Sequence, residues 1–481
     1  MIKSVLTSLA FCMSLMWFAP AHADEVGHQG LLITNVRILD LSGSEPAFQD
    51  GMSVLTRGDV VEQVGPKNAL AIPEKVATFD GQGMILMPGL VDMHVHLWDE
   101  AALGAYLGHG ITTIRNASGM PFHLRLAQQI ASGDVVGPRL ITTGPILNGR
   151  GANTQLNHQI VENEAQAREA VRSQYAAGYR HIKVYSNLSR NAYFGARDEA
   201  RKLGMTIMGH SPEGIRPAGA PKEKPFRLPF ESLIDDGFVS FEHIETIVWH
   251  GLRNRYDEHG ARALARRIAA AGVAVDPTLL AFYNLVRVAE TRGEYVHRNG
   301  VDLLNPLLVM QEQPNYDRWA HEDVGAAQEA FDFFKRATKI FAEEGVTLVA
   351  GSDAGIFTNI PGQSLVDELH LLVDAGLSPF MALKAATYNA ALTLDEETRV
   401  GKIAPGYRAD FLLLRQNPLA DIGAIDHPYS VVAAGRPYDR TMLDHLLETA
   451  RKHDPGRTLR NVQEGLAAQG GDPDILNALA E

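Results

Sequence analysis

Cysteine is almost absent from this chain. Its 481 residues include a single cysteine, Cys12, which lies in an amino-terminal stretch that a signal peptidase is expected to remove. A mature chain without cysteine forms no disulfide bonds and offers no thiolate as a metal ligand or nucleophile. Any metal site must therefore be built from histidine, carboxylates and modified side chains.

The amino-terminal segment, residues 1–23, has the order of a secretory signal peptide. One charge, Lys3, precedes an apolar stretch from Val5 to Phe18, and Ala21-His22-Ala23 provides a small-x-small cleavage site. The apolar stretch is too short to span a bilayer. We predict cleavage after this site and a periplasmic or secreted protein.

Basic residues are also fewer than acidic ones. Lys and Arg number 44 against 57 Asp and Glu, which gives a net charge of −13, and loss of Lys3 with the signal peptide makes it −14. An acidic protein binds nucleic acid and anionic lipid poorly. No other apolar stretch is long enough to cross a membrane. We expect a small-molecule substrate, no nucleic-acid or membrane partner, and leave a homo-oligomer open.

The pair His94-Val95-His96 is the most informative feature that is present. It follows a hydrophobic stretch, and alternate residues of a strand point to the same face, so both imidazoles would project together. Neutral ring nitrogens side by side suit zinc and related divalent ions. An ordinary buried polar pair is the alternative for this motif taken alone.

Four later segments have the same form, an apolar or β-branched stretch that ends in a potential ligand. Each is followed by a Gly, Pro or polar stretch and then a helix-like pattern, which predicts βαβ units and a parallel sheet. In a closed parallel barrel, functional side chains collect at the carboxyl ends of the strands. Together with His94 and His96, the candidate ligands are Lys183, His210, His243 and Asp353.

The two ends of the chain have a different sequence pattern from this middle part. Short alternating strands are expected over residues 31–40, 52–65, 75–86, 409–414 and 431–435. We predict an α/β fold in which residues 87–398 form a (β/α)8 TIM-like barrel. Residues 24–86 and 399–440 would pair into one discontinuous β-sandwich, and residues 441–481 would form a terminal helix with a loosely attached tail after His453.

Lys183 and Asp353 are the two candidates whose roles need explanation. An ammonium group would repel a metal, but a lysine buried near cations has a lowered pKa, and its neutral amine can capture carbon dioxide as a carbamate that bridges two cations. A simple pair between Lys183 and Asp353 is the alternative. Asp353 can both bind a metal and accept a proton, or cap the segment that follows. His181 lies deeper on the strand of Lys183 and is expected in the core or in a supporting role.

The ordered ligand set resembles the amidohydrolase superfamily in its binuclear, carboxylated-lysine form. The resemblance runs from Leu31 to Gly435 and includes residues 87–92, 110–115, 375–387 and 401–406. Ile182–Tyr185 and Gly351–Gly355 are similar to the imidazolonepropionase-related branch, which includes prolidase-like Xaa-Pro and Xaa-Arg dipeptidases.

The resemblance implies a role for each ligand. His94, His96 and Asp353 would hold the more buried of two divalent ions, which we expect to be zinc. His210 and His243 would hold the more exposed ion, and carboxylated Lys183 would bridge the two. Asn116 departs from the family pattern, where relatives often have an acid, so the partner of Arg115 stays open.

We predict a metal-dependent hydrolase that cleaves the amide bond of a small substrate such as a dipeptide or N-acyl amino acid. A hydroxide bridging the metals would attack the carbonyl carbon, and Asp353 would carry its proton to the leaving nitrogen. Tyr185 would donate a hydrogen bond to the developing oxyanion, or else only pack at the barrel top. A lactonase, esterase or phosphotriesterase, and a non-catalytic scaffold, are the alternatives.

Two long segments are expected near the substrate. Residues 212–229 are rich in proline and basic residues and follow His210 directly, so they either attract a substrate carboxylate or form a solvated surface loop. Residues 283–321 have the aromatic content and the length of a lid.

Overall fold

The fold was obtained as a computed structural model, which describes residues 30–151, 154–216 and 224–471. The predicted signal peptide, residues 1–23, lies outside the described residues. In the part of the chain that is described, no helix is both long and apolar enough to cross a membrane.

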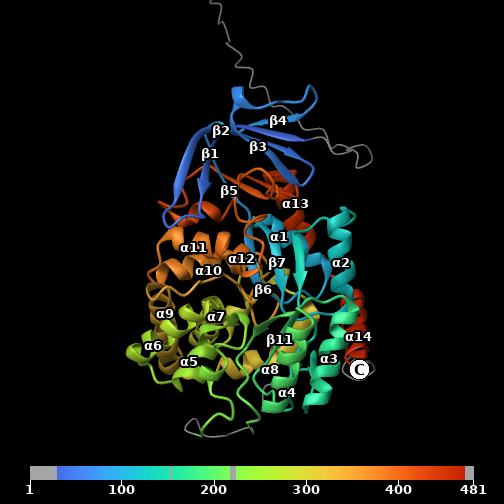
Figure 1. Ribbon diagram of the computed structural model, residues 1–481, viewed down its shortest axis with the longest axis vertical. Helices are drawn as coiled ribbons and strands as arrows, with labels where there is room; N and C mark the ends of the chain where they lie inside the picture. Colours follow the sequence, from blue (N-terminus) through green and yellow to red (C-terminus); the bar gives the residue numbers. More distant parts are fainter. Residues whose placement is uncertain (1–29, 152–153, 217–223, 472–481) are drawn as a thin grey trace, which may run out of the picture.

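Parallel strands lie at the centre of the molecule (Figure 1), and backbone hydrogen bonds join eight of them into a closed barrel. Seven of them are β6 (Leu90–Val95), β7 (Ile111–Asn116), β8 (Arg139–Thr142), β11 (His181–Val184), β12 (Thr206–Gly209), β13 (Phe238–Glu242) and β14 (Ala274–Asp276). The eighth is the segment 347–350, which joins β14 through the bridge of Val275 with Leu348 and joins β6 through the Met93 amide, 2.9 Å from the Ala350 carbonyl. Between β8 and β11 the Gly144 amide donates to the His181 carbonyl at 2.8 Å. The predicted barrel is confirmed.

Helices alternate with these strands and surround them (Figure 1). They are α1 (Leu103–Gly108), α2 (Pro121–Ser132), α3 (Glu164–Ala177), α4 (Arg190–Lys202), α5 (Ile244–Leu252), α6 (Glu258–Ala271), α7 (Leu279–Glu290), α8 (Pro306–Trp319), α9 (Val324–Glu343), α10 (Gln363–Asp374), α11 (Pro379–Ala385) and α12 (Tyr388–Thr393). Short 3-10 turns lie at Lys67–Ala69, Glu100–Ala102, Phe230–Ser232, Glu294–His297, Val301–Leu303 and Ile422–Ile425. Two further short strands, β9 (Ile146–Asn148) and β10 (His158–Ile160), pair beside β11.

Helix α9 shows how the sequence produces this layer. Asp323 accepts a hydrogen bond from the Ala326 amide at 2.7 Å and so caps the first turn. Phe334, Ala337 and Phe341 recur at helical spacing and are buried, and the helix packs on α5, α6 and α7. Burial of one such phenylalanine contributes about 2 kcal/mol, so this face fixes the helix on the neighbouring helices.

Strands from both ends of the chain form a second domain. Its sheet has the order β17 (Arg436–Asp439), β16 (Ser430–Ala433), β15 (Phe411–Leu414), β5 (Ile85–Pro88), β1 (Leu31–Asp40), β2 (Ala47–Arg57), β3 (Val60–Pro66), with β4 (Ala77–Asp80) also on β1. Antiparallel pairing of β15 with β5 joins the two ends directly, as predicted. Since β5 leads at once into β6, this domain lies at the amino-terminal end of the barrel strands, at the top of Figure 1.

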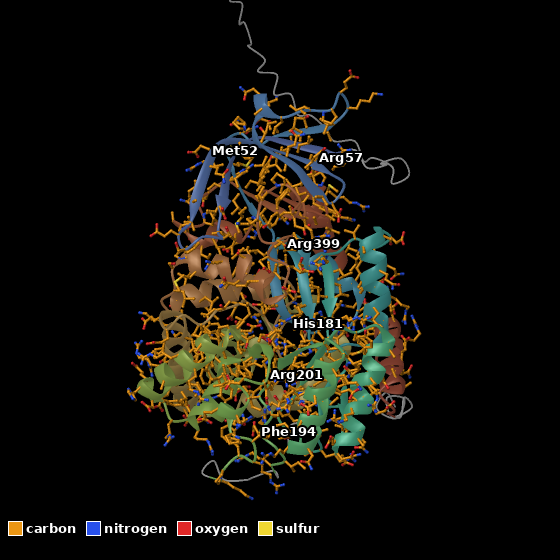
Figure 2. All side chains as sticks on the ribbon, viewed as in Figure 1. Met52, Arg57, His181, Phe194, Arg201 and Arg399 are labelled. Carbon is orange, nitrogen blue, oxygen red and sulfur yellow. The ribbon has the colours of Figure 1, made fainter. Side chains whose placement is uncertain are left out.

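Labelled side chains mark the sheet domain and the barrel. Figure 2 shows Met52 and Arg57 on the sheet domain, His181 in the barrel, and Arg399 between them. His181 is half-buried, and its Nδ1 lies 2.6 Å from Thr206 Oγ1, so it supports the strand pair β11–β12, as its depth in the strand predicted.

The predicted loose tail after His453 is wrong up to residue 468. Helix α13 (Arg440–Ala450) is followed by a second helix, α14 (Pro455–Ala468), which packs on α2. Arg457 Nε donates to Asp99 Oδ2 at 2.7 Å, and Asn461 Nδ2 donates to the Trp98 carbonyl at 3.1 Å. The signals were the Asp454 cap before Pro455 and the apolar Val462 and Leu466 on one face. This helix therefore ties the chain end to the segment just after β6.

Candidate metal centre and active site

The structure brings the first three predicted ligands and the lysine to one point at the carboxyl end of the barrel. Asp353 Oδ1 lies 3.1 Å from His96 Nε2 and 3.4 Å from His94 Nε2. Lys183 Nζ lies 3.0 Å from the same His94 Nε2. All four side chains are buried. Because β6, β11 and the 347–350 segment end at the same rim, side chains far apart in sequence meet there.

The other two predicted ligands adjoin this group. The His243 ring centroid is 4.8 Å from that of His94 and 4.5 Å from that of His210. His210 Nδ1 is buried and has no hydrogen-bond partner among the described residues. An unsatisfied buried nitrogen is costly, and a bound cation would satisfy it. The six predicted ligands therefore form one continuous group.

The outer ring nitrogens orient three of the histidines. His94 Nδ1 donates to Glu242 Oε2 at 2.7 Å, and His96 Nδ1 lies 3.0 Å from Ser118 Oγ. His243 Nδ1 lies 2.6 Å from Thr278 Oγ1, whose hydroxyl donates to the Pro277 carbonyl, so the imidazole is the donor. Each contact leaves Nε2 facing the group, the arrangement by which proteins hold histidine ligands of divalent ions. The residues present fit such ions.

The backbone at the strand ends is unusual. His243 and Asp353, two of the candidate ligands, have φ values of 67° and 53°, and Thr278 behind His243 has a φ of 45°. Such left-handed backbone costs about 1 kcal/mol or more in a non-glycine residue and collects at functional sites. Gly351 is needed for close approach, since a Cβ there would lie 2.0 Å from Asp276 Oδ2 and 2.6 Å from His94 Cβ.

Burial sets the protonation states that metal binding needs. It lowers the pKa of Lys183 to about 8 and that of His243 to about 4, so the imidazole is neutral and the amine is neutral far more often than an exposed lysine. Burial alone would raise the pKa of Asp353, but the hydrogen bond from His96 and favourable electrostatic interactions with His94 and His243 hold it below its usual value. A neutral histidine and an ionised aspartate are the ligand forms.

Arg115, whose partner the sequence left open, pairs with Glu242. Its Nη2 donates to Glu242 Oε1 at 2.9 Å, its Nη1 donates to Ser240 Oγ at 3.1 Å, and its Nε donates to the Met93 carbonyl at 2.6 Å. Glu242 was missed in the sequence because it precedes His243 directly, and strand alternation assigns neighbours to opposite faces. The left-handed backbone at His243 lets both residues serve the same site.

Two further buried carboxyl groups were missed. Asp92 accepts hydrogen bonds from the Ser352 amide at 3.0 Å and from Ser352 Oγ at 2.5 Å, and so joins β6 to the loop that carries Asp353. Asp276 accepts from the Gly351 amide at 2.9 Å, beside Glu242 and His94. Burial and then the charge of Glu242 raise the pKa of Asp276 well above its usual value. Asp276 therefore holds the Gly351 backbone beside His94.

A cavity of about 510 Å³ opens over the ligands. A row of four rings crosses its floor in the order of the strands, with centroid separations of 4.7 Å from His158 to Tyr185, 4.0 Å from Tyr185 to His210 and 4.5 Å from His210 to His243. Tyr185 thus stands beside the ligands, where it was predicted. His158, at the start of β10, was missed because it follows no strand-like stretch.

The two predicted specificity segments both reach this cavity. In the described part of residues 212–229, Arg216 lines the cavity, and its guanidinium donates to the Lys224 carbonyl at 2.8 Å and lies 4.4 Å from the Phe226 ring. Glu213 also lines it and accepts from Trp249 Nε1 at 3.0 Å. Burial raises the pKa of Glu213 to about 7.

Residues 283–321 are mostly ordered as helix. Leu285 on α7 and Arg318 and Trp319 on α8 line the cavity. Helix α8 lies toward the end of the barrel opposite the sheet domain (Figure 1). The segment therefore covers the cavity with packed helices.

The sequence profile of the amidohydrolase family matches residues 85–438. The ochratoxinase of Aspergillus niger is 24% identical over 416 residues, which cover 72% of this chain and 73% of that protein. The imidazolonepropionase of Rubrobacter xylanophilus is 44% identical over 73 residues, 14% of this chain and 18% of that protein.

Solved structures share the fold. Bottromycin amidohydrolase has a TM-score of 0.69 and 24% identity, with 92% of this chain and 91% of that chain covered. A Xaa-Pro dipeptidase with bound methionine has a TM-score of 0.63 and 19% identity, with 85% of this chain and 100% of that chain covered. These likenesses show that the chain shares the architecture of these structures.

Proposed function

The chain belongs to the amidohydrolase family and is a hydrolase, and we propose that it cleaves the amide bond of a small substrate, a dipeptide or N-acyl amino acid, with the help of two divalent metal ions. One observation carries the proposal. Six potential ligands from five barrel strands meet beneath one cavity, and the outer nitrogens of His94, His96 and His243 are hydrogen-bonded away from it.

The six ligands would be shared between a deeper ion and one nearer the cavity. His94, His96 and Asp353 would hold the deeper ion, and His210 and His243 would hold the other, nearer the cavity. Lys183 would supply oxygens to both as its carbamate, because its lowered pKa favours the neutral amine that reacts with carbon dioxide. Bound divalent ions, which we expect to be zinc, lower the pKa of water and polarise a carbonyl oxygen.

Asp353 has the proton-transfer role in this proposal. Its carboxylate is buried and ionised, and it lies at the floor of the cavity, so it can accept the proton that water loses as the new C–O bond forms. The same proton then passes to the amide nitrogen as the C–N bond breaks. Without that transfer the leaving group would be an amide anion, which is very unstable.

Tyr185 is positioned to assist at the carbonyl. Its ring stands between His158 and His210, and its side chain lines the cavity. Burial raises the pKa of its hydroxyl far above the usual value, so it stays a hydrogen-bond donor at neutral pH. A donor held there would stabilise the negative oxygen that develops during attack.

An activity screen tests this assignment. The zinc-loaded chain is assayed with panels of dipeptides and N-acyl amino acids, and in parallel with lactones, carboxylic esters and phosphotriesters. The proposal predicts that amides give the highest kcat/KM. A preference for an ester, lactone or phosphotriester would assign the site to that chemistry instead, and a metal-loaded protein inactive on all panels would favour a non-catalytic scaffold.

A further inference from the structure

Two sets of polar groups line the cavity at different places. The ring row His158, Tyr185, His210, His243 follows the order of neighbouring strands, so His158 and His243 lie at its two ends with the candidate ligand His210 between them. Hydrogen-bond donors gather at the His158 end. An acid, Glu245, follows His243 at the other end, in the first turn of α5.

The His158 end offers donors that have no acceptor. His158 Nδ1 receives hydrogen bonds from Asn148 Nδ2 at 3.0 Å and from the Gln155 amide at 3.2 Å, which places the ring proton on Nε2. His158 Nε2 and Asn187 Nδ2 are both buried and lack a hydrogen-bond partner among the described residues. Both residues line the cavity. Such donors are costly unless a ligand supplies an acceptor.

The opposite end offers a carboxylate with no cation. Glu245 is partly exposed to the cavity and accepts a hydrogen bond from Thr246 Oγ1 at 3.1 Å. No lysine, arginine or histidine nitrogen of the described residues forms an ion pair with it. A second acid, Glu213, lines the same cavity, and its carboxylate has the Trp249 indole and Arg216, 3.8 Å away, as partners. Glu245 is therefore the acid left for a ligand.

A substrate that satisfies both ends of the row has an acceptor at one end and a cation at the other, with its amide over the candidate ligand His210 between them. We propose that Glu245 binds the free ammonium group of a dipeptide, while His158 and Asn187 bind the terminal carboxylate. This inference rests on the proposed amide hydrolysis and selects dipeptides over N-acyl amino acids. An N-acyl group has no positive charge, so it would leave Glu245 buried beneath the substrate without a partner.

The test compares free and acetylated dipeptides on the zinc-loaded chain. The best-cleaved member of a dipeptide panel is assayed beside its N-acetyl derivative, which keeps the scissile bond and removes the ammonium charge. We expect KM to be at least about tenfold higher for the acetylated form, the usual size of one lost charge-assisted hydrogen bond. Equal kcat/KM for the two forms would overturn the inference.

A variant assigns this selectivity to one residue. Glu245→Gln should raise KM for the free dipeptide about tenfold, change kcat by less than about threefold, and leave KM for the acetylated form unchanged. Glu258→Gln, an exposed acid at the start of α6, is the matched control and should change neither substrate. Tm and zinc content are measured on each variant, so that lost folding or lost metal is separated from lost binding.

Failure of the inference and failure of the proposed function give different results. If the chain cleaves N-acyl amino acids as well as or better than dipeptides, or if Glu245→Gln affects both forms equally, the function stands and the ammonium site is wrong. If the chain cleaves no amide, both are wrong.

Discussion

His94 and Glu242 are joined by a hydrogen bond of 2.7 Å between Nδ1 and Oε2, and both side chains are fully excluded from solvent. Glu242 is itself fixed by Arg115 at 2.9 Å. The imidazole that faces the candidate metal position is therefore set by an ion pair inside the barrel.

This relationship predicts an effect on metal affinity. Glu242→Gln should weaken zinc binding by about 10- to 100-fold, because such outer contacts orient the ring and raise its basicity. The affinity is measured by competition with a chelating dye. Glu199→Gln, a buried acid of α4 paired with Arg168, is the control. Unchanged zinc affinity in Glu242→Gln would show that His94 needs no such support.

Lys183 gives a second prediction. Lys183→Ala should lower the bound zinc below two ions per chain and abolish turnover, because the bridging oxygens are lost. A short-chain carboxylic acid such as propionate should restore part of the activity by occupying the space. Lys202→Ala, on the exposed face of α4, should retain metal and activity. Elemental analysis that finds the same zinc content in Lys183→Ala as in the wild type would rule out the bridging role.

A variant of Asp353 can separate proton transfer from metal binding. Asp353→Asn keeps the size and one oxygen but removes the base, so the metals should remain largely bound while kcat falls by roughly 10²-fold or more. The acidic limb of the pH–rate profile should also disappear in this variant. Near-normal kcat with both metals present would place the proton transfer on another residue.

Glu213 predicts a pH dependence of stability. Burial raises its pKa in the folded state to about 7, above the usual value of 4.5, so the folded state binds more protons than the unfolded state between these values. Its destabilising effect is therefore absent below the unfolded pKa and grows as the pH rises toward 7. Glu213→Gln should gain stability over the wild type at pH 8 relative to pH 5, by on the order of 2 kcal/mol. Equal differences in Tm at the two pH values would contradict this.

The sequence predicted those features that have a repeated pattern of apolar and polar residues. Barrel strands are apolar stretches that end in a polar residue, so the positions of His94, His96, Lys183, His210 and Asp353 followed from counting along strands and from the family resemblance. The split sheet domain followed from alternating strands at both ends of the chain.

Other features depend on contacts between residues distant in sequence. Glu242 and Asp276 act only because the barrel closes on His94, and no local pattern shows that closure. His158 acquires its role from Asn148 and the Gln155 amide, which fix its tautomer. Helix α14 had local signals, but its docking on Asp99 depends on the barrel surface. Residues of this kind could not be identified from the sequence.

The central claim is that two divalent ions held by this side-chain group support amide hydrolysis, and a metal titration tests it most directly. Metal-free chain is titrated with zinc while bound zinc and hydrolysis of the preferred amide are followed together. We predict that activity is negligible without metal and rises to a plateau at two ions per chain, whereas Lys183→Ala fails to reach it. Full activity in the metal-free chain, or a plateau at one ion, would contradict the account.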